Sequence, residues 1–214
     1  MDSSKIKLTF LLLIAALPIT LATWFYGLRE MQGISVTSNK GVLIVPVLDI
    51  TALAMHDDAG EPIFQTFEDA VAGVSAKEYQ PRPWLLVYLG GPDCDSACAQ
   101  RLYFLRQLHR RLGREVDRVA RYHVNVTQDR RSLTEATRTL FAEQFPELGQ
   151  ASADRDTLLK NLAGSLPADV DPVTEHYIYV VDPVGNVMLY FTPENTPEDI
   201  LRDLDRLLDQ SSLG

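Results

Sequence analysis

Two cysteines lie four residues apart, directly after an apolar segment. Cys94 and Cys98 are the only cysteines of the 214-residue chain, and they follow residues 84–89 and a Gly-Gly-Pro turn. If a helix begins near Asp95, positions i and i+4 share one of its faces, so both sulfur atoms can point to the same spot at the first turn. Two thiols placed in this way can share a metal ion or close a small disulfide loop.

A long apolar segment near the N-terminus predicts a membrane anchor. Residues 8–28 carry no charge, are long enough to cross a bilayer and end near three consecutive aromatic residues. Two lysines precede the segment, which favours a cytoplasmic N-terminus. A cleaved signal peptide is the alternative, but the apolar segment is longer than an ordinary signal core and lacks a clear cleavage site. We predict a cytoplasmic tip and transmembrane helix over residues 1–29.

Export of the remaining chain changes how the cysteines are interpreted, because an oxidising compartment permits disulfides. A purely structural disulfide is therefore an alternative. Its weakness is geometric, since a cross-link between positions four apart restricts the unfolded chain very little. The spacing of Cys94 and Cys98 favours redox or metal chemistry.

Composition fits one globular domain with a short appendage. The chain is 46% hydrophobic and 23% charged. We expect a linker over residues 30–40 and the domain over residues 41–214. The formal net charge of −9 argues against nucleic acid as a partner. A local group of arginines is expected to coat the solvated face of one helix and its exit: Arg101, Arg106, Arg110, Arg111, Arg114, Arg118 and Arg121. A docking surface for an acidic partner is the alternative.

Hydrophobic periodicity predicts an α/β domain. Strands are expected over residues 41–50, 84–89, 119–127, 176–181 and 187–191, and helices over residues 67–74, 95–112, 132–145, 156–162 and 196–208. The last two strands form a hairpin around an Asp-Pro-Val-Gly turn. This order indicates a central mixed sheet with helices on both sides.

The order of elements, with a cysteine pair between a core strand and its helix, resembles the thioredoxin fold. A thioredoxin has the spacing CxxC, whereas this chain has CxxxC. The wider spacing is similar to that of the Sco/SenC family of membrane-anchored copper proteins, which help to assemble the copper centre of cytochrome oxidase. That family places a histidine before a late hairpin, and His176 precedes Asp182-Pro183-Val-Gly185 in the same way.

The resemblance implies a copper site made of Cys94, Cys98 and His176. This chain departs from the family pattern, because Asp95 and Ala99 follow the cysteines where the family usually has proline. Pro92 and Asp93 precede the pair where the family has threonine, and the acid that commonly follows the middle strand is replaced near residues 125–127. The chain is identified as a divergent bacterial member.

The donor set also favours copper on chemical grounds. Two thiolates and one imidazole form a soft three-donor set that suits cuprous copper. Zinc stays open, because a structural zinc site takes a fourth ligand and Asp93, Asp95 and Glu175 are nearby candidates. The three other histidines are interpreted as ordinary half-buried polar residues: His56, His109 and His123.

Three functions remain as hypotheses. The first is a copper metallochaperone, single-pass in the bacterial inner membrane with its C-terminal domain in the periplasm, that acts on a cytochrome c oxidase subunit or another copper chaperone. The second is a thiol-disulfide oxidoreductase in which Cys94 attacks and Cys98 resolves the mixed disulfide. The third is a non-catalytic assembly scaffold that keeps the cysteines as a disulfide.

Overall fold

The structure is a computed structural model. It describes residues 38–57, 59–64, 66–75, 82–128 and 131–211, together with residues 7, 14, 16–21 and 23–24. The chain divides into two units, Met1–Ser38 and Asn39–Gly214. Among the described residues there is no helix of the length and apolar character that a membrane span requires. Most of the anchor predicted over residues 1–29 and most of the 30–40 linker lie outside the described residues.

A six-stranded mixed sheet organises the unit that begins at Asn39. The strands are β1 (Val42–Asp49), β2 (Trp84–Gly90), β3 (Val119–Thr127), β4 (Gly149–Asp154), β5 (Ile178–Val181) and β6 (Asn186–Phe191). Their order across the sheet is β1-β6-β5-β2-β3-β4. β2, β3 and β4 run parallel, whereas β2 pairs antiparallel with β5 and the β5–β6 hairpin continues to β1.

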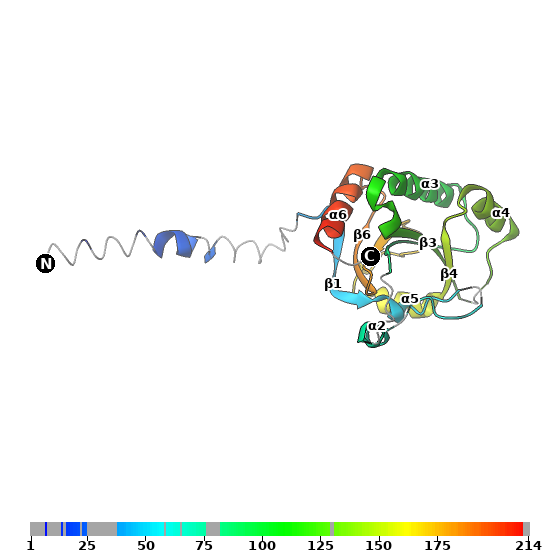
Figure 1. Cartoon of the computed structure of the whole chain (residues 1–214), viewed down its shortest axis with the longest axis horizontal. Coiled ribbons are helices and arrows are strands. Elements are labelled where there is room, and N and C mark those ends of the chain that lie inside the picture. Colours follow the sequence, from blue (N-terminus) through cyan, green and yellow to red (C-terminus); the bar gives the residue numbers. More distant parts are fainter. Residues whose placement is uncertain are drawn as a thin grey trace. The chain divides into compact units, whose positions relative to one another are not determined.

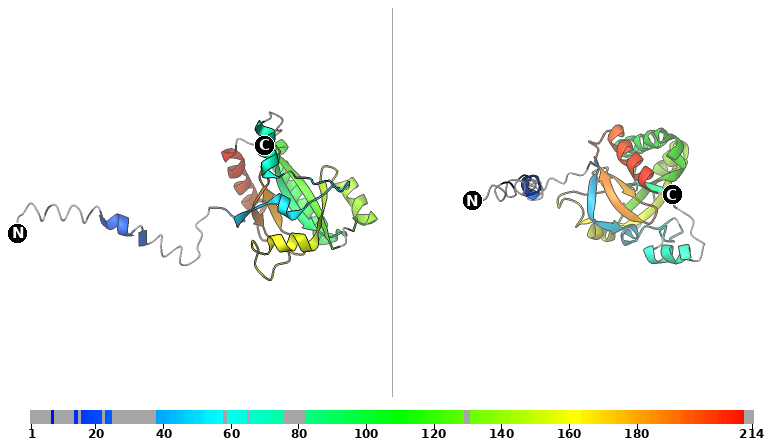
Figure 2. Two further views of the ribbon diagram at one scale, coloured as in Figure 1. Left: turned by 90° about the horizontal axis from the view of Figure 1, so that it is seen from below. Right: turned by 60° about the vertical axis from the view of Figure 1, so that its left-hand side comes forward.

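Helices cover both faces of the sheet (Figures 1 and 2). They are α2 (Phe67–Ser75), α3 (Ser96–Arg111), α4 (Glu135–Gln144), α5 (Arg155–Leu162) and α6 (Pro197–Gln210), with 3₁₀ helices η1 (Ile50–Leu53) and η2 (Gly113–Arg118). Side chains of α3, α4 and α6 form one apolar core with the sheet, whereas α5 and η1 form a second core on its other face. This arrangement confirms the predicted α/β fold with a central mixed sheet and flanking helices.

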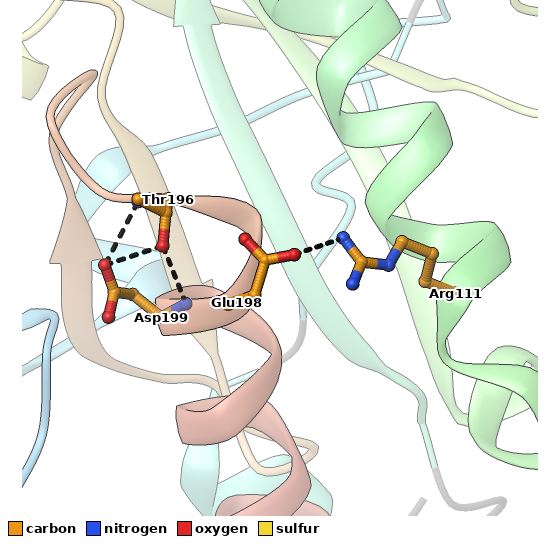
Figure 3. A network of polar contacts seen from close by, with 4 residues as sticks. All are labelled: Arg111, Thr196, Glu198 and Asp199. Carbon is orange, nitrogen blue, oxygen red and sulfur yellow. Dashed lines mark hydrogen bonds and ion pairs between the residues drawn. The ribbon is translucent and has the colours of Figure 1, made fainter.

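Helix α6 begins with a complete capping box. The Thr196 hydroxyl accepts from the Asp199 backbone N–H, and the Asp199 carboxylate accepts from the Thr196 backbone N–H. Glu198 in the same first turn forms an ion pair of 2.9 Å with Arg111 of α3, as Figure 3 shows. The neighbouring helices α3 and α6 are thus linked at the surface as well as through their apolar faces.

Most predicted elements are found within a few residues of their expected limits, but strand β4 was missed. Its sequence, Gly-Gln-Ala-Ser-Ala-Asp, has low strand propensity and no apolar alternation. Gly149 reads as the end of the preceding helix, which in the structure ends earlier, at Gln144. β4 forms at the edge of the sheet because β3 offers a buried parallel partner along its whole length.

Candidate thiol and metal site

The cysteine pair lies at the start of helix α3 and is joined by a disulfide. The Asp95 carboxylate caps the helix by accepting the Cys98 backbone N–H at 2.9 Å, so the predicted helix start is confirmed. The Cα atoms of Cys94 and Cys98 are 5.2 Å apart. Cys98 is buried with 5% of its surface exposed and belongs to the core, whereas Cys94 is half-buried and packs against that core.

The N-terminus of helix α4 holds the loop that carries Cys94. The buried Thr137 hydroxyl accepts the Cys94 backbone N–H at 2.9 Å. The Thr134 backbone N–H, at the cap of α4, donates to the Pro92 carbonyl at 3.0 Å. Both bonds fix the loop backbone from outside the cysteine motif. The position of Cys94 therefore depends on α4 as well as on α3.

His176 lies just before strand β5 in a left-handed backbone conformation, with φ of 55°. Such a φ is uncommon for a residue other than glycine and is retained where the surroundings fix it. Its Nδ1 atom is 2.7 Å from the hydroxyl of Tyr88 on strand β2. The two rings are stacked, with 6° between their planes. Tyr88 thereby fixes the orientation of the imidazole, and no hydrogen bond to Nε2 is found in the described part of the chain.

Arg101 connects helix α3 to the His176 backbone. Its Nε–H donates to the His176 carbonyl at 2.9 Å, and its Nη2 donates to the Thr192 carbonyl at 3.0 Å. Arg101 comes one helical turn after Cys98 and is itself buried. Burial lowers the pKa of the Arg101 guanidinium to about 10, so the side chain stays positive at neutral pH. The cation thus joins the segment that carries His176 to the helix that carries Cys98.

Burial and two nearby charges change the pKa of the Tyr88 hydroxyl. Burial raises the pKa of its hydroxyl, the carboxylate of Asp95 raises it further, and the cation of Arg101 lowers it. Tyr88 therefore stays neutral and can either donate to an imidazole nitrogen or accept from it. The tautomer of His176 decides which of the two occurs.

The three predicted metal ligands are linked to one another only in part. The two cysteines are in direct contact, while His176 is joined to their helix through Arg101 and to strand β2 through Tyr88. Across the residues that the structure describes, no three His, Cys, Asp or Glu side chains are grouped so as to hold a metal ion. The Cys94, Cys98 and His176 ligand set remains a prediction for the reduced protein.

The candidates for a fourth zinc ligand are differently engaged. Asp95 is exposed and its carboxylate caps helix α3. Asp93 and Glu175 are exposed at the surface. The hydrogen bond to Cys98 engages only one oxygen of Asp95, so the zinc interpretation stays open.

His123 is more buried than the sequence suggested. It is completely buried on β3, and neither ring nitrogen has a hydrogen-bond partner among the described residues. It makes an edge contact with Phe141, with ring centroids 4.9 Å apart, and lies beside Tyr88. A Cβ atom on Gly90 would come within 2.7 Å of its Nε2, so a glycine is needed there. Burial lowers the pKa of His123 to about 4.

The other two histidines have structural surroundings. His109 Nε2 is 2.6 Å from the Val119 carbonyl, which ties the end of α3 to the start of β3. His56 forms an isolated bridge with Ser152 at the edge of β4. Both fit the interpretation as ordinary polar residues.

Three of the seven arginines, Arg110, Arg111 and Arg114, are exposed as predicted, but the others are not. Arg101 and Arg121 are buried. The Nη2 atom of Arg121 lies 3.3 Å from Oε2 of Glu147, whose side chain is exposed. Arg106 bonds to the Gln144 carbonyl and lies over two aromatic rings, Tyr103 and Phe145. The prediction was wrong for Arg101, Arg106 and Arg121. Arg101 and Arg106 donate to backbone carbonyls, whereas Arg121 pairs with the Glu147 carboxylate.

Sequence reasoning missed Tyr88, Arg101 and Thr137 as parts of the site. A partial signal existed for Arg101, which lies on the same face of α3 as Cys98. Nothing in the sequence marked Tyr88 or Thr137, because their roles depend on the pairing of β2 with β5 and on the packing of α4.

The fold and the cysteine pair at the start of helix α3 define the class as a thioredoxin-like protein. Residues 84–211, more than half of the chain, match the family model described as the transmembrane-like, thioredoxin-like, C-terminal domain. The chain belongs to this family. No curated protein sequence matches the chain.

Solved structures of Sco proteins share the fold. The Arabidopsis thaliana ScoI structure with copper bound is 13% identical with a TM-score of 0.52, covering 78% of this chain and 99% of that one. The solution structure of apo Sco1 from Thermus thermophilus is 14% identical with a TM-score of 0.51, covering 81% and 99%. A third structure is BsSco, described with a disulfide switch as a member of the Sco family of cytochrome c oxidase assembly proteins. It is 14% identical with a TM-score of 0.51, and the match covers 82% of this chain and 99% of that one.

Proposed function

We propose that the protein is a copper-binding metallochaperone whose ligands are the reduced sulfurs of Cys94 and Cys98 and the Nε2 atom of His176. The observation that carries the proposal is the connection of His176 to helix α3 through Arg101, one turn after Cys98. Two soft sulfurs and an imidazole suit cuprous copper. The copper-bound Sco structure with the same fold supports this choice of metal.

Reduction must precede binding, because the two sulfurs are joined by a disulfide. An external dithiol would supply two electrons and two protons, becoming a disulfide itself and leaving two thiols on this chain. Binding of the ion then releases both thiol protons. The oxidised pair is thus the copper-free state of the cycle.

Tyr88 selects the nitrogen of His176 that faces the metal. Binding through Nε2 requires the neutral tautomer with its proton on Nδ1, and that N–H can donate to the Tyr88 oxygen at the observed distance of 2.7 Å. The same hydrogen bond would orient the imidazole ring before the ion arrives.

The finer cellular role follows from the sequence. The apolar run over residues 8–28 supports a single-pass anchor in the bacterial inner membrane with the domain in the periplasm. We infer delivery of copper to a cytochrome c oxidase subunit or another copper chaperone, supported by the description of BsSco as an oxidase assembly protein. Removal of residues 1–29 should release the protein from the membrane fraction.

Metal analysis tests the copper site directly. Full-length protein in detergent, reduced and loaded with copper under anaerobic conditions, should bind one ion. Cys98→Ala should lose most of the bound copper, and His176→Ala should weaken it. Ser96→Ala, at an exposed position between the cysteines, serves as the matched control and should bind as the parent does. Full stoichiometry in Cys98→Ala would sink the assignment.

A second candidate function is thiol-disulfide exchange. It is favoured by the disulfide itself and by the burial difference, since Cys94 is half-buried and Cys98 is buried. An accessible Cys94 would attack a partner disulfide and Cys98 would resolve it. His176→Ala separates the two functions: exchange survives this change while copper binding is weakened. A double Cys-to-Ser variant that retains full function in cells would instead favour a scaffold.

A further inference from the structure

A pocket of about 400 Å³ lies at the β4 edge of the sheet. Its lining comes from the segment around His56, from the end of β3, from β4, from residues 131–133 before α4 and from Arg138 of α4. The α4 cap at Thr134 also holds the Cys94 loop through Pro92, so the pocket adjoins that loop. None of the residues assigned to the copper site lines this pocket.

A buried polar atom in the pocket lacks a partner. Asn125 lines the pocket and has 4% of its surface exposed. Its amide Nδ2 donates to the Arg131 carbonyl at 2.6 Å, which fixes the amide orientation. Within the described part of the chain its Oδ1 accepts no hydrogen bond. An unsatisfied buried acceptor is costly, so a ligand with an N–H or O–H donor would gain by meeting it.

The charge on the pocket wall is mainly positive. Arg131 and Arg138 both line it and are both exposed. Arg138 pairs with Glu135 at 2.7 Å, but both side chains are more than half exposed, so the pair is weak and exchangeable. Asp57, an acid on the wall, is engaged by the backbone N–H groups of Ala59 and Glu61. A carboxylate ligand fits this balance.

Strand β4 offers main-chain groups at the same edge. The Ser152 N–H donates to the His56 carbonyl at 2.7 Å, and the Ser152 carbonyl accepts from His56 at 2.9 Å, both on the side away from β3. Because backbone direction alternates along a strand, Gln150 also points its N–H and carbonyl outward. Gln150 lines the pocket and is exposed. The His56 segment already pairs with this edge at Ser152, so the part that can accept a further extended segment is at Gln150.

We propose that this pocket is a docking site for an extended, acidic peptide segment of a partner protein. The segment pairs with the outer edge of β4 at Gln150, as in recognition by strand addition. Its carboxylate contacts Arg131 and Arg138, and a neighbouring donor side chain satisfies Asn125 Oδ1. Such a contact would bring the partner beside the Cys94 loop, and it forms without any metal ion.

Fluorescence anisotropy with labelled peptides tests the site on the full chain in detergent, metal-free with its disulfide intact. The probe is acetyl-Val-Thr-Glu-Thr-Val-amide, and the matched peptide has Lys in place of Glu. We expect the Glu peptide to bind about tenfold more tightly than the Lys peptide. Equal binding of the two peptides, or no binding of either at millimolar concentration, overturns the proposal.

Variants assign the binding to the pocket. The double change Arg131→Glu and Arg138→Glu should reverse the preference toward the Lys peptide. The control pair Arg110→Glu and Arg114→Glu changes two residues that are exposed elsewhere on the domain. It should change the affinity for the Glu peptide by no more than about twofold. If the control pair weakens binding as strongly as the pocket pair, net charge alone explains the loss, and the assignment of the site to this pocket is wrong.

A proline tests the strand pairing. Gln150→Pro removes the outward N–H without removing a bond to β3, and should weaken the Glu peptide about tenfold. Gln150→Ala keeps the N–H and should bind as the parent does. If Gln150→Pro binds normally, or if free glutarate displaces the probe as fully as unlabelled peptide does, the site takes small anions and the peptide proposal fails. Because no metal is present, these outcomes are independent of the copper site.

Discussion

The hydroxyl oxygen of Tyr88 lies 2.7 Å from Nδ1 of His176, with the two rings stacked at 6°. This contact joins strand β2 to His176, two residues before β5, and fixes which imidazole nitrogen is left for a metal ion. Neither residue needs to move for the contact to serve in both tautomers, because the tyrosine hydroxyl can donate or accept.

Tyr88→Phe should therefore weaken cuprous copper binding about 10- to 100-fold, the usual cost of losing a partner that orients a ligand. Competition with a chromophoric cuprous chelator measures the affinity. The matched control is Tyr179→Phe, a buried tyrosine in the core on the other face, whose hydroxyl has no partner among the described residues. Nitrogen NMR of His176 gives a second readout, since its tautomer ratio should change in Tyr88→Phe alone. Equal affinities in parent and variant would count against the role of Tyr88.

The cysteines should differ in reactivity once they are reduced. Cys94 is half-buried whereas Cys98 is 5% exposed, so iodoacetamide should modify Cys94 about tenfold faster. Mass spectrometry of peptides after timed labelling measures both rates in one sample. If Cys98 reacts first, the assignment of Cys94 as the attacking thiol is wrong.

Loss of Arg101 should destabilise the domain. Arg101→Met leaves the carbonyls of His176 and Thr192 without their donors, and we expect a loss of about 2–4 kcal/mol in the free energy of unfolding. Urea denaturation of the full chain in detergent measures it. Arg110→Met, on the same helix but exposed, should change stability by no more than about 0.5 kcal/mol. Similar losses in both variants would show that the Arg101 bonds contribute little.

The buried His123 should make the domain sensitive to acid. Its pKa is about 4 in the folded protein and about 6.5 when unfolded, so the unfolded chain binds more protons between these values. The stabilisation from the neutral imidazole is complete above about pH 6.5 and is lost as the pH falls toward 4, by about 3 kcal/mol in total.

The variant His123→Leu should lack this part of the pH dependence. Its free energy of unfolding should fall less steeply than that of the parent between pH 6.5 and 4, as measured by urea denaturation at several pH values. His109→Leu is no suitable control because its ring bonds to backbone carbonyls; the parent measured over the same pH values is the reference. Identical slopes in the parent and His123→Leu would mean that His123 does not govern the acid response.

Elements with strong periodicity could be predicted from the sequence. Helix α3 has its apolar residues at helical spacing, and strand β3 was expected with the limits it has, Val119–Thr127. The fold class followed from their order. Strand β4 could not be predicted, because small and polar residues form a strand there only through pairing with β3.

The site was predictable only where chemistry is local. The cysteine spacing and the Asp95 cap are features of adjacent residues. The meeting of Tyr88 with His176 depends on the antiparallel register of β2 and β5, in which Tyr88 faces Ile178. The burial of His123 depends on the missing side chain of Gly90 on the neighbouring strand. Long-range contacts of this kind leave no pattern in a single sequence.

X-ray absorption spectroscopy of the reduced, copper-loaded protein tests the central claim most directly. The proposed site predicts a cuprous ion with two sulfur ligands and one imidazole nitrogen. In His176→Ala the imidazole signal should be absent from the spectrum. A spectrum with nitrogen and oxygen ligands alone, or one unchanged by loss of Cys98, would contradict the assignment of Cys94, Cys98 and His176 as the copper ligands.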